Sequence, residues 1–342
     1  MPRESTGMRS FLLYAKLIVI YAVLGVSMIL AFLYFTNFLR HNADIAASNV
    51  LTLKIGRTAY LYSHASIQYV CGRYDPQLGY LLKPGECNFQ DVEYKMRFDV
   101  NSAGLRDDED SLADPDVVLL GDSHALGIGV SQDEIFAARI EAGAGLKVLN
   151  AGVSSYGTAR EMMLLRRLNI YSANTIVIQY CRNDFGENKK YFEFGGRLDI
   201  MPQEKYENIA ATDIENQQSF IQPGIGVLTR AVEKVTESVG SFVSEKHDEI
   251  DEVEAFKYAI EKNRDLLEGK KIIILELNGH NRYDNLFVSK AKPRLQELGL
   301  DLHFIDASRF LTDQDYFTLD NHMTADGHRK VAEAILEVIR AP

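Results

Sequence analysis

The sequence predicts a three-layer α/β/α domain with a parallel sheet, tethered to a membrane by one N-terminal helix. Short continuous apolar runs, such as 117–120 and 175–180, alternate with segments of helical periodicity. Such runs are typical of strands that are buried on both faces of a parallel sheet. Ahead of them, residues 17–35 contain no charged side chain, and a helix of about 20 apolar residues is enough to cross the core of a bilayer.

Length, composition and charge limit the kinds of protein that this sequence can encode. With 342 residues, the chain suits one large α/β domain with appendages, or about two domains. An apolar fraction of 46% and a charged fraction of 25% are ordinary for a globular protein. The net charge of −11, together with the lack of a basic stripe, argues against a nucleic-acid-binding protein.

We expect residues 1–40 to form an uncleaved transmembrane anchor that contacts the lipid bilayer through residues 11–38. The apolar segment is too long for a typical signal-peptide core, and no small-residue cleavage site follows it closely. A buried core helix is the less favoured alternative. Basic residues flank the span equally on both sides, which leaves its orientation open. The closeness of Lys16 and the free amino terminus favour an N-terminus on the inner side.

Residues 41–113 are expected to form a stalk followed by a β-rich extension of the main domain. From Tyr69 to Arg106, short strand-like pieces alternate with turn residues. Cys71 and Cys87 both lie in this segment. A disulfide between them would fit an oxidising compartment, and two unrelated thiols are an equally open alternative.

The main domain is expected at residues 114–342, where predicted strands and helices alternate as in a parallel sheet with right-handed crossovers. Its strands are predicted at 117–120, 147–150, 175–180, 271–277 and 302–305, and its helices at 133–142, 158–168 and 323–339. Residues 186–268 interrupt this order with a predicted hairpin at Gly195–Gly196 and two helical segments, near 228–246 and 251–267. The insertion is either a lid or partner surface, or a peripheral helical layer without function.

Polar or small side chains follow three of the predicted strands. Ser123 lies in a Gly-Asp-Ser-His turn after the first strand, small residues fill the loop 150–158, and Asn183 follows the third strand. Asp320 and His322 precede the closing helix. Ligands of open α/β sheets bind beyond the carboxyl ends of the strands. We therefore expect these residues to share one site, with Ser123 as a nucleophile.

These blocks resemble those of the SGNH (GDSL-type) hydrolases, which carry Ser, Gly, Asn and His in four blocks. Gly121-Asp122-Ser123 matches the first block and Asp320-Asn321-His322 matches the last. The third block, Cys181-Arg182-Asn183-Asp184, has a cysteine where glycine is usual. In the second block, Ser155 stands where the family has an oxyanion-hole glycine. The Asp-x-His spacing is similar to that of a branch that includes polysaccharide O-acetylation proteins, and parts of the extension look like those of membrane-anchored relatives.

The resemblance implies a flavodoxin-like fold and serine-dependent chemistry. Ser123 would attack an ester carbonyl, His322 would take the proton, and Asp320 would orient His322. The resulting oxyanion would be bound by the backbone N–H groups of Ser123 and Ser155 and by the side-chain amide of Asn183.

The function implied is hydrolysis of ester-linked acyl groups on an extracytoplasmic carbohydrate or glycolipid. The chain would be a single-pass protein of the inner membrane with a periplasmic catalytic domain. An O-acyltransferase of a cell-envelope polysaccharide, working beside a membrane acyltransferase, is one alternative, and a catalytically silent scaffold of a membrane complex is another. No cofactor is implied, and metal binding by His124 or His280 is unfavoured because no carboxylate or cysteine lies at ligand spacing.

Overall fold

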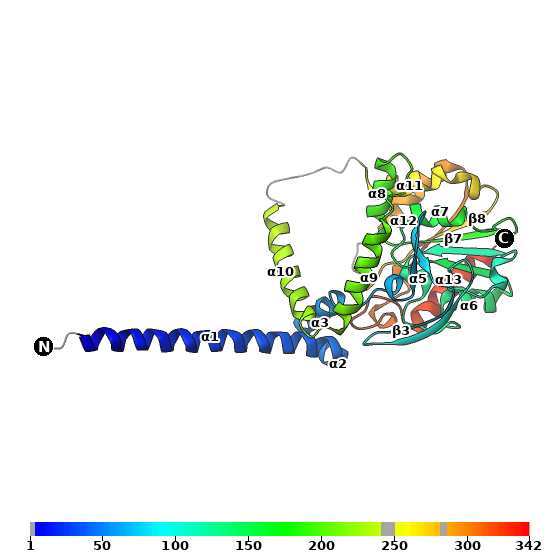
Figure 1. The fold of residues 1–342 in the computed structure, drawn as a ribbon. Coiled ribbons are helices and arrows are strands. Elements are labelled where there is room, and N and C mark those ends of the chain that lie inside the picture. Colours follow the sequence, from blue (N-terminus) through cyan, green and yellow to red (C-terminus); the bar gives the residue numbers. More distant parts are fainter. Residues whose placement is uncertain (1–3, 241–249, 281–285, 342) are drawn as a thin grey trace. The chain divides into compact units, whose positions relative to one another are not determined.

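The computed structural model describes residues 4–240, 250–280 and 286–341. The chain divides into two compact units, one formed by residues 1–64 and 216–243 and the other by residues 65–215 and 244–342. The second unit contains the sheet, and the first contains a long apolar helix (Figure 1).

The second unit is built on a five-stranded parallel sheet with the strand order β6-β5-β7-β8-β9. The strands are β5 (Val117–Gly121), β6 (Val148–Gly152), β7 (Thr175–Tyr180), β8 (Lys271–Glu276) and β9 (Asp301–Asp306). The predicted parallel sheet is therefore confirmed. From β5 the chain passes to the edge strand β6 and returns as β7 on the other side of β5. The carboxyl end of β5 is thus the switch point, where open α/β sheets bind ligands.

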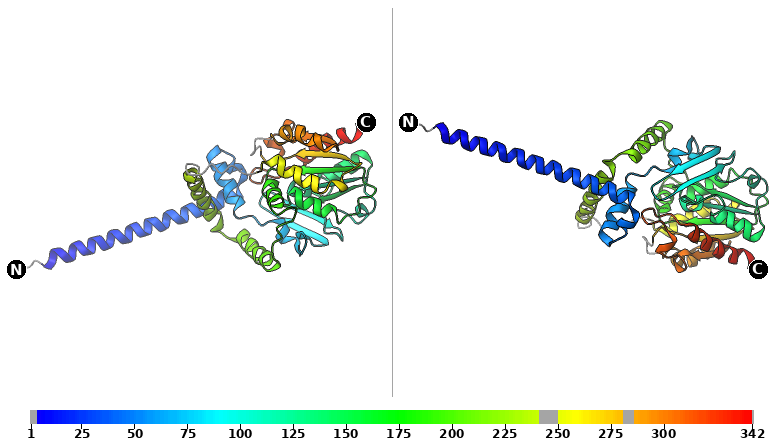
Figure 2. Two further views of the ribbon diagram at one scale, coloured as in Figure 1. Left: turned by 90° about the horizontal axis from the view of Figure 1, so that it is seen from above. Right: turned by 90° about the horizontal axis from the view of Figure 1, so that it is seen from below.

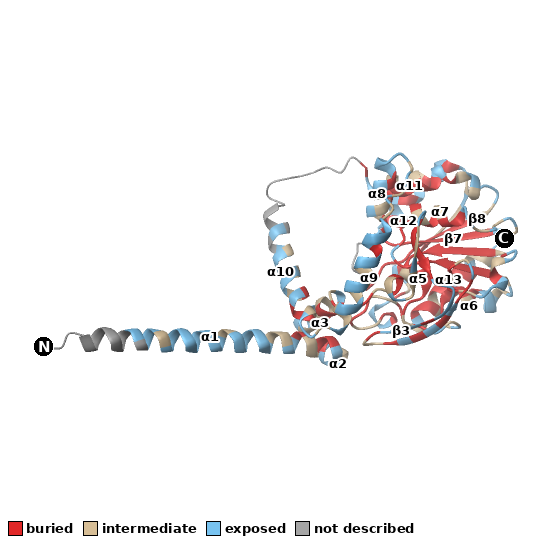
Figure 3. Cartoon of the chain, in the orientation of Figure 1, coloured by how far each residue is buried: buried red, intermediate tan, exposed pale blue. Residues whose placement is uncertain are grey.

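Helices cover both faces of this sheet, which confirms the three layers. Val118 and Leu120 of β5 join one core with the helices α7 (Thr158–Leu165), α11 (Glu252–Lys262) and α12 (Phe287–Leu295). Val117 and Leu119 join the other core with α6 (Phe136–Ala144) and α13 (Ala325–Arg340). This alternation is the two-residue period of a strand that is buried on both faces. Figure 3 shows the central strands buried between the helical layers.

The β-rich extension consists of two antiparallel strand pairs. They are β1 (Gly72–Asp75) with β2 (Gly79–Leu82), and β3 (Gly85–Gln90) with β4 (Lys95–Val100). A disulfide joins Cys71 to Cys87, whose Cα atoms are 5.8 Å apart. Leu78 and Tyr80 pack in the same core as the sheet residues Val118 and Leu120. The extension is therefore part of the second unit.

The predicted hairpin at Gly195–Gly196 is wrong. The helix α8 (Asp184–Glu193) runs up to these glycines, whose φ angles are 64° and 88°. The N–H of Gly196 donates to the carbonyl of Tyr191 at 2.8 Å, so the left-handed glycines end the helix. The two glycines suggest a hairpin turn in the sequence because a helix end and a tight turn require the same backbone conformation.

The described residues of the insertion after Gly196 form three α-helices. The helix α9 (Gln203–Gln218) occupies a polar stretch for which the sequence gives no element, and α10 (Gln222–Gly240) and α11 lie near the two predicted helical segments. Phe256 of α11 is fully buried in the core beside the sheet. At least this end of the insertion is therefore a structural layer.

The first unit contains α1 (Glu4–His41), α2 (Ala43–Ala46), α3 (Val50–Leu61) and α10. Within the described residues, α1 is the helix that is long and apolar enough to cross a membrane: an 18-residue stretch inside Leu13–His41 has a mean hydropathy of 2.5. Its apolar side chains are exposed along most of its length (Figure 3). A signal sequence has the same properties.

Candidate active site

Ser123 is held at the carboxyl end of β5 by a tight turn. Gly121 ends the strand, and a Cβ at this position would lie 2.5 Å from Gln179 Oε1 and 2.6 Å from Ala125 Cβ. Only glycine fits this space, because real Cβ atoms do not approach other atoms so closely. The backbone can therefore turn directly from the strand into the short helix that begins with Ser123.

Asp122 stabilises this turn as a helix cap. Its Oδ1 accepts the N–H of His124 at 2.9 Å, at the start of α5 (Ser123–Leu126). The Asp122 carboxylate is buried, whereas Ser123 remains partly exposed. Asp122 thus caps the short helix, and Ser123 lies at the switch point.

Asp320 and His322 form a hydrogen-bonded pair in the loop before α13. His322 Nδ1 lies 2.5 Å from Asp320 Oδ1, and the backbone N–H of His322 donates to the same oxygen at 3.0 Å. Asp320 is 2% exposed. A buried carboxylate on Nδ1 favours the tautomer in which Nε2 carries the lone pair, as a general base requires.

The hairpin that joins β3 to β4 holds this loop in place. Tyr94 donates its hydroxyl to Asp320 Oδ2 at 2.7 Å. The carboxylate of Glu93 accepts the backbone N–H groups of Leu319 and Asp320, both at 2.7 Å. The loop conformation that brings Asp320 to His322 is therefore fixed by residues of the extension, which the sequence did not single out.

Two further histidines surround the pair. The ring centroid of His124 lies 5.2 Å from that of His322, and His280 Nε2 lies 2.7 Å from the backbone oxygen of Asp320. Burial lowers the pKa of His124 to about 4, so this residue is neutral at pH 7. In the part of the chain that the structure describes, no cluster of three or more His, Cys, Asp or Glu residues could hold a metal ion.

The contact between the His124 and His322 rings brings the Ser123 turn close to the Asp320–His322 loop, because Ser123 directly precedes His124 in the chain. A hydrogen bond between Ser123 Oγ and His322 stays a prediction. Such bonds are often long before substrate binds and shorten in the complex.

The candidate oxyanion donors lie on the loops after β6 and β7. Ser155 is exposed and has a φ of 61°, a left-handed conformation that glycine adopts more readily than serine. The backbone thus keeps the conformation expected of a glycine at this position of the second block. Asn183 is exposed, and its side-chain amide donates to Asp122 Oδ2 at 3.2 Å. The amide has a second N–H, which can donate to an oxyanion.

Behind this edge lies a group of buried side chains that do not reach the surface. The thiol of Cys181 lies 3.4 Å from Asn278 Oδ1, and burial raises its pKa well above the usual range. Burial also raises the pKa of Glu161 and of Asp184 well above the usual range. Thr158 donates to Asp184 at 2.9 Å. These groups support the loops and are poor candidates for nucleophiles.

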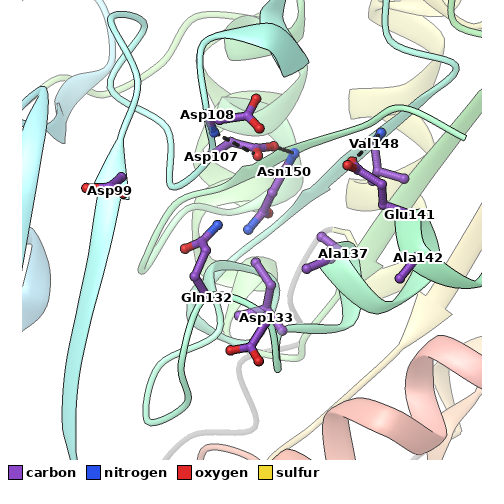
Figure 4. Close-up of a pocket in the computed structure, with 12 residues that line it drawn as sticks. Asp99, Asp107, Asp108, Gln132, Asp133, Ala137, Glu141, Ala142, Val148 and Asn150 are labelled. Atoms are coloured by element: carbon purple, nitrogen blue, oxygen red, sulfur yellow. Dashed lines mark hydrogen bonds between the residues drawn. The ribbon is translucent and has the colours of Figure 1, made fainter.

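An acidic pocket of about 390 Å³ lies along the outer side of β6 (Figure 4). None of the predicted site residues lines it. Asp107 Oδ2 accepts the N–H of Asn150 at 2.7 Å, and Glu141 Oε2 accepts the N–H of Val148 at 3.1 Å. Because β6 is an edge strand, these carboxylates satisfy N–H groups that no neighbouring strand pairs. The pocket therefore has a structural explanation.

No protein-family model matches the sequence, and no curated protein matches it. Similar solved structures include a lipolytic G-D-S-L family protein from Desulfitobacterium hafniense DCB-2, with 12% identity and a TM-score of 0.38, over 65% of this chain and 98% of that one. A family 2 carbohydrate esterase with a carbohydrate-binding domain, from Corynascus thermopiles (Myceliophthora fergusii), has 13% identity and a TM-score of 0.38, over 65% of this chain and 64% of that one.

An acetyl xylan esterase from the rumen bacterium Butyrivibrio proteoclasticus has 11% identity and a TM-score of 0.37, over 66% of this chain and 63% of that one. Identities and TM-scores this low do not assign the chain to a family or an activity.

Proposed function

We propose that this protein is a serine-dependent esterase that removes ester-linked acyl groups from an extracytoplasmic carbohydrate or glycolipid. The observation that carries the proposal is the Asp320–His322 hydrogen bond of 2.5 Å, with the His322 ring beside that of His124, the neighbour of Ser123. A buried carboxylate, an imidazole and a serine on a strand-end turn are the parts of an activated nucleophile.

In the proposed reaction, Ser123 Oγ forms a bond to the acyl carbon while its proton passes to His322 Nε2. The negative oxygen of the intermediate accepts hydrogen bonds from the N–H groups of Ser123 and Ser155 and from the Asn183 amide. The bond to the carbohydrate oxygen then breaks, and His322 returns the proton to that oxygen. Water, deprotonated by His322, attacks the acyl-serine, releases the acid and restores Ser123.

The proposed location is the periplasmic side of an inner membrane crossed once by α1. The Cys71–Cys87 disulfide supports an oxidising compartment. A transferase is the second candidate: a polysaccharide hydroxyl would replace water as the attacking group, and a membrane acyltransferase would be the partner that supplies acyl groups. Transfer and hydrolysis share the same acyl-serine, so the proposed site serves both.

Covalent labelling with a fluorophosphonate probe tests the proposal. The native chain should be labelled, and both Ser123→Ala and His322→Ala should lose labelling together with turnover of an aryl acetate, by a factor on the order of 10³–10⁶. Ser154→Ala is the matched control. Ser154 is a buried serine in the loop after β6 and is not part of the proposed triad. Equal labelling of Ser123→Ala and the native chain would contradict the proposal, and a catalytically silent scaffold would then be favoured.

A further inference from the structure

The helix α10 of the first unit has its apolar side turned away from the helices against which it packs. Four apolar side chains recur at helical spacing on this side, each between 46% and 63% exposed: Ile221, Ile225, Leu228 and Val232. Pro223, Gly224 and Gly226, which lie outside this row of residues, are buried. A surface helix of a water-soluble unit shows the reverse arrangement. We call these four residues the apolar stripe.

The buried side of α10 is fixed against α1. A Cβ on Gly224 would overlap Leu33 and lie 3.2 Å from Thr36 Oγ1, so glycine lets the two backbones approach closely. Gly226 makes the same kind of approach to Tyr62, which follows α3. Figure 1 and Figure 2 both show α10 running across the axis of α1 near the end of that helix.

Polar groups also lie on this inner side. Glu233 accepts the hydroxyl of Tyr62 at 2.9 Å and the guanidinium of Arg230 at 3.1 Å. Arg40 of α1 is buried and donates to the backbone oxygen of Gln217 at 3.0 Å. Because the inner contacts use small and polar residues, the outward direction of the apolar stripe is a fixed property of the packing.

The depth of this contact along α1 indicates what covers the stripe. The uncharged part of α1 begins at Leu17, and about 20 helical residues cross the hydrocarbon core, which ends near Thr36. α10 contacts α1 at Leu33 and Thr36, which is that level. Exposed Ile29 and Leu30, earlier on α1, continue the apolar surface toward the membrane interior. A water-soluble partner that covered the stripe would have to enter the lipid.

We propose that α10 lies in the interfacial layer of the bilayer that α1 crosses, with the apolar stripe among the upper acyl chains. Amphipathic helices that lie parallel to the membrane plane bind in this way. The inference rests on α1 crossing a membrane and is independent of the chemistry at Ser123. It assigns the α10 part of the insertion at 186–268 a contact with lipid, whereas the α11 part is a structural layer of the second unit.

The test places an environment-sensitive fluorophore on a single introduced cysteine in the full chain, reconstituted in phosphatidylcholine vesicles with a fraction of anionic lipid. Leu228→Cys and Val232→Cys probe the stripe, and Lys234→Cys is the matched control on another side of the same helix. The native cysteines form a disulfide or, at Cys181, are buried, so they do not compete for the label. Flotation with the vesicles, resistant to carbonate, reports separately on insertion of α1.

We expect lipids with a shallow nitroxide to quench the stripe probes at least threefold more than the Lys234 probe, and aqueous iodide to show the reverse order. Equal iodide access at all three positions in chains that float would overturn the proposal. Oxidation of Leu228→Cys to a linked dimer would also overturn it, in favour of a second copy as the occupant. Chains that do not float would overturn both this inference and the membrane anchor, without bearing on the esterase.

Discussion

Tyr94 donates a 2.7 Å hydrogen bond to Asp320 although the two residues are 226 positions apart in the chain. The Asp320 carboxylate is thereby bound on both oxygens, by Tyr94 on Oδ2 and by His322 on Oδ1. Glu93, the neighbour of Tyr94, binds the backbone N–H groups that lead into Asp320. The hairpin of the extension thus sets the orientation of the carboxylate, and through it that of the imidazole.

This relationship predicts that Tyr94→Phe impairs catalysis without unfolding the protein. A hydrogen bond to a charged group contributes about 1.5–3 kcal/mol, so kcat should fall by about 10- to 100-fold while KM changes little. Steady-state kinetics on an aryl acetate would measure both constants. Tyr74→Phe, at a partly buried tyrosine of β1, is the matched control and should leave kcat unchanged. A rise in KM alone would mean that Tyr94 contacts substrate and does not position Asp320.

The sequence predicts the site where its information is local. Ser123 and Asn183 follow apolar runs that become buried parallel strands, and the pairing of strands at one sheet edge places them together. Asp320 and His322 are two residues apart, so a loop conformation is enough to join them. This is why the sheet and the polar residues at its edge are predictable from one chain.

Other parts of the site depend on contacts that no local pattern records. The Tyr94 and Glu93 bonds to the Asp320 loop exist only once the extension has packed on the sheet domain, and His280 reaches the backbone of Asp320 across 40 positions. The prediction of a hairpin at Gly195–Gly196 was wrong for a different reason. Glycine allows left-handed backbone but does not say whether a helix ends or a strand turns there.

A second prediction concerns the left-handed φ of 61° at Ser155. Such a conformation costs a non-glycine residue about 1–2 kcal/mol, whereas glycine loses about 0.5–1 kcal/mol of unfolded-chain entropy. Ser155→Gly should therefore raise the free energy of unfolding by about 0–1.5 kcal/mol. It should leave kcat within twofold, because the backbone N–H remains.

Ser155→Ala is the control for this change, since it keeps the strain and removes only the hydroxyl, which accepts from Gln68 at 3.4 Å. Denaturant unfolding of the three proteins would give their order, with the glycine variant expected to be the most stable. If Ser155→Gly were less stable than Ser155→Ala, the strain at this position would be smaller than the entropy lost.

A third prediction follows from the buried carboxyl groups of Glu161 and Asp184. Burial, and then the neighbouring acid, raises the pKa of Glu161 well above the usual range in the folded state. Between the unfolded pKa near 4.5 and the folded pKa, the folded chain binds the proton and the unfolded chain does not. The free energy of unfolding must therefore fall as pH rises through this window.

Glu161→Gln removes one of these protons and should flatten the fall in the free energy of unfolding as pH rises above about 5, by up to about 1.4 kcal/mol per pH unit. The slope should not vanish, because burial also raises the pKa of Asp184. Urea unfolding at a series of pH values would measure the difference. Glu204→Gln on exposed α9 is the control and should run parallel to the native curve. A Glu161→Gln curve that is parallel too would mean that Glu161 is ionised in the folded protein.

The last prediction concerns the disulfide of the extension, which closes a loop of 16 residues in sequence separation. In the chain-entropy model, a loop of about this length stabilises the folded state by roughly 3 kcal/mol. Cys71→Ala/Cys87→Ala should therefore lower the unfolding midpoint, and dithiothreitol should lower that of the native chain to a similar level. The double variant should not respond to the reductant, because Cys181 is buried and has no partner for a disulfide among the described residues.

The hairpin of Glu93 and Tyr94 follows Cys87 along β3, so the double variant should also lose part of its kcat. The contrary outcome is a native chain whose unfolding midpoint does not respond to dithiothreitol and whose Cys71 and Cys87 thiols are alkylated without reduction. It would show that the disulfide is not formed in the isolated protein, and the disulfide would no longer support a periplasmic location.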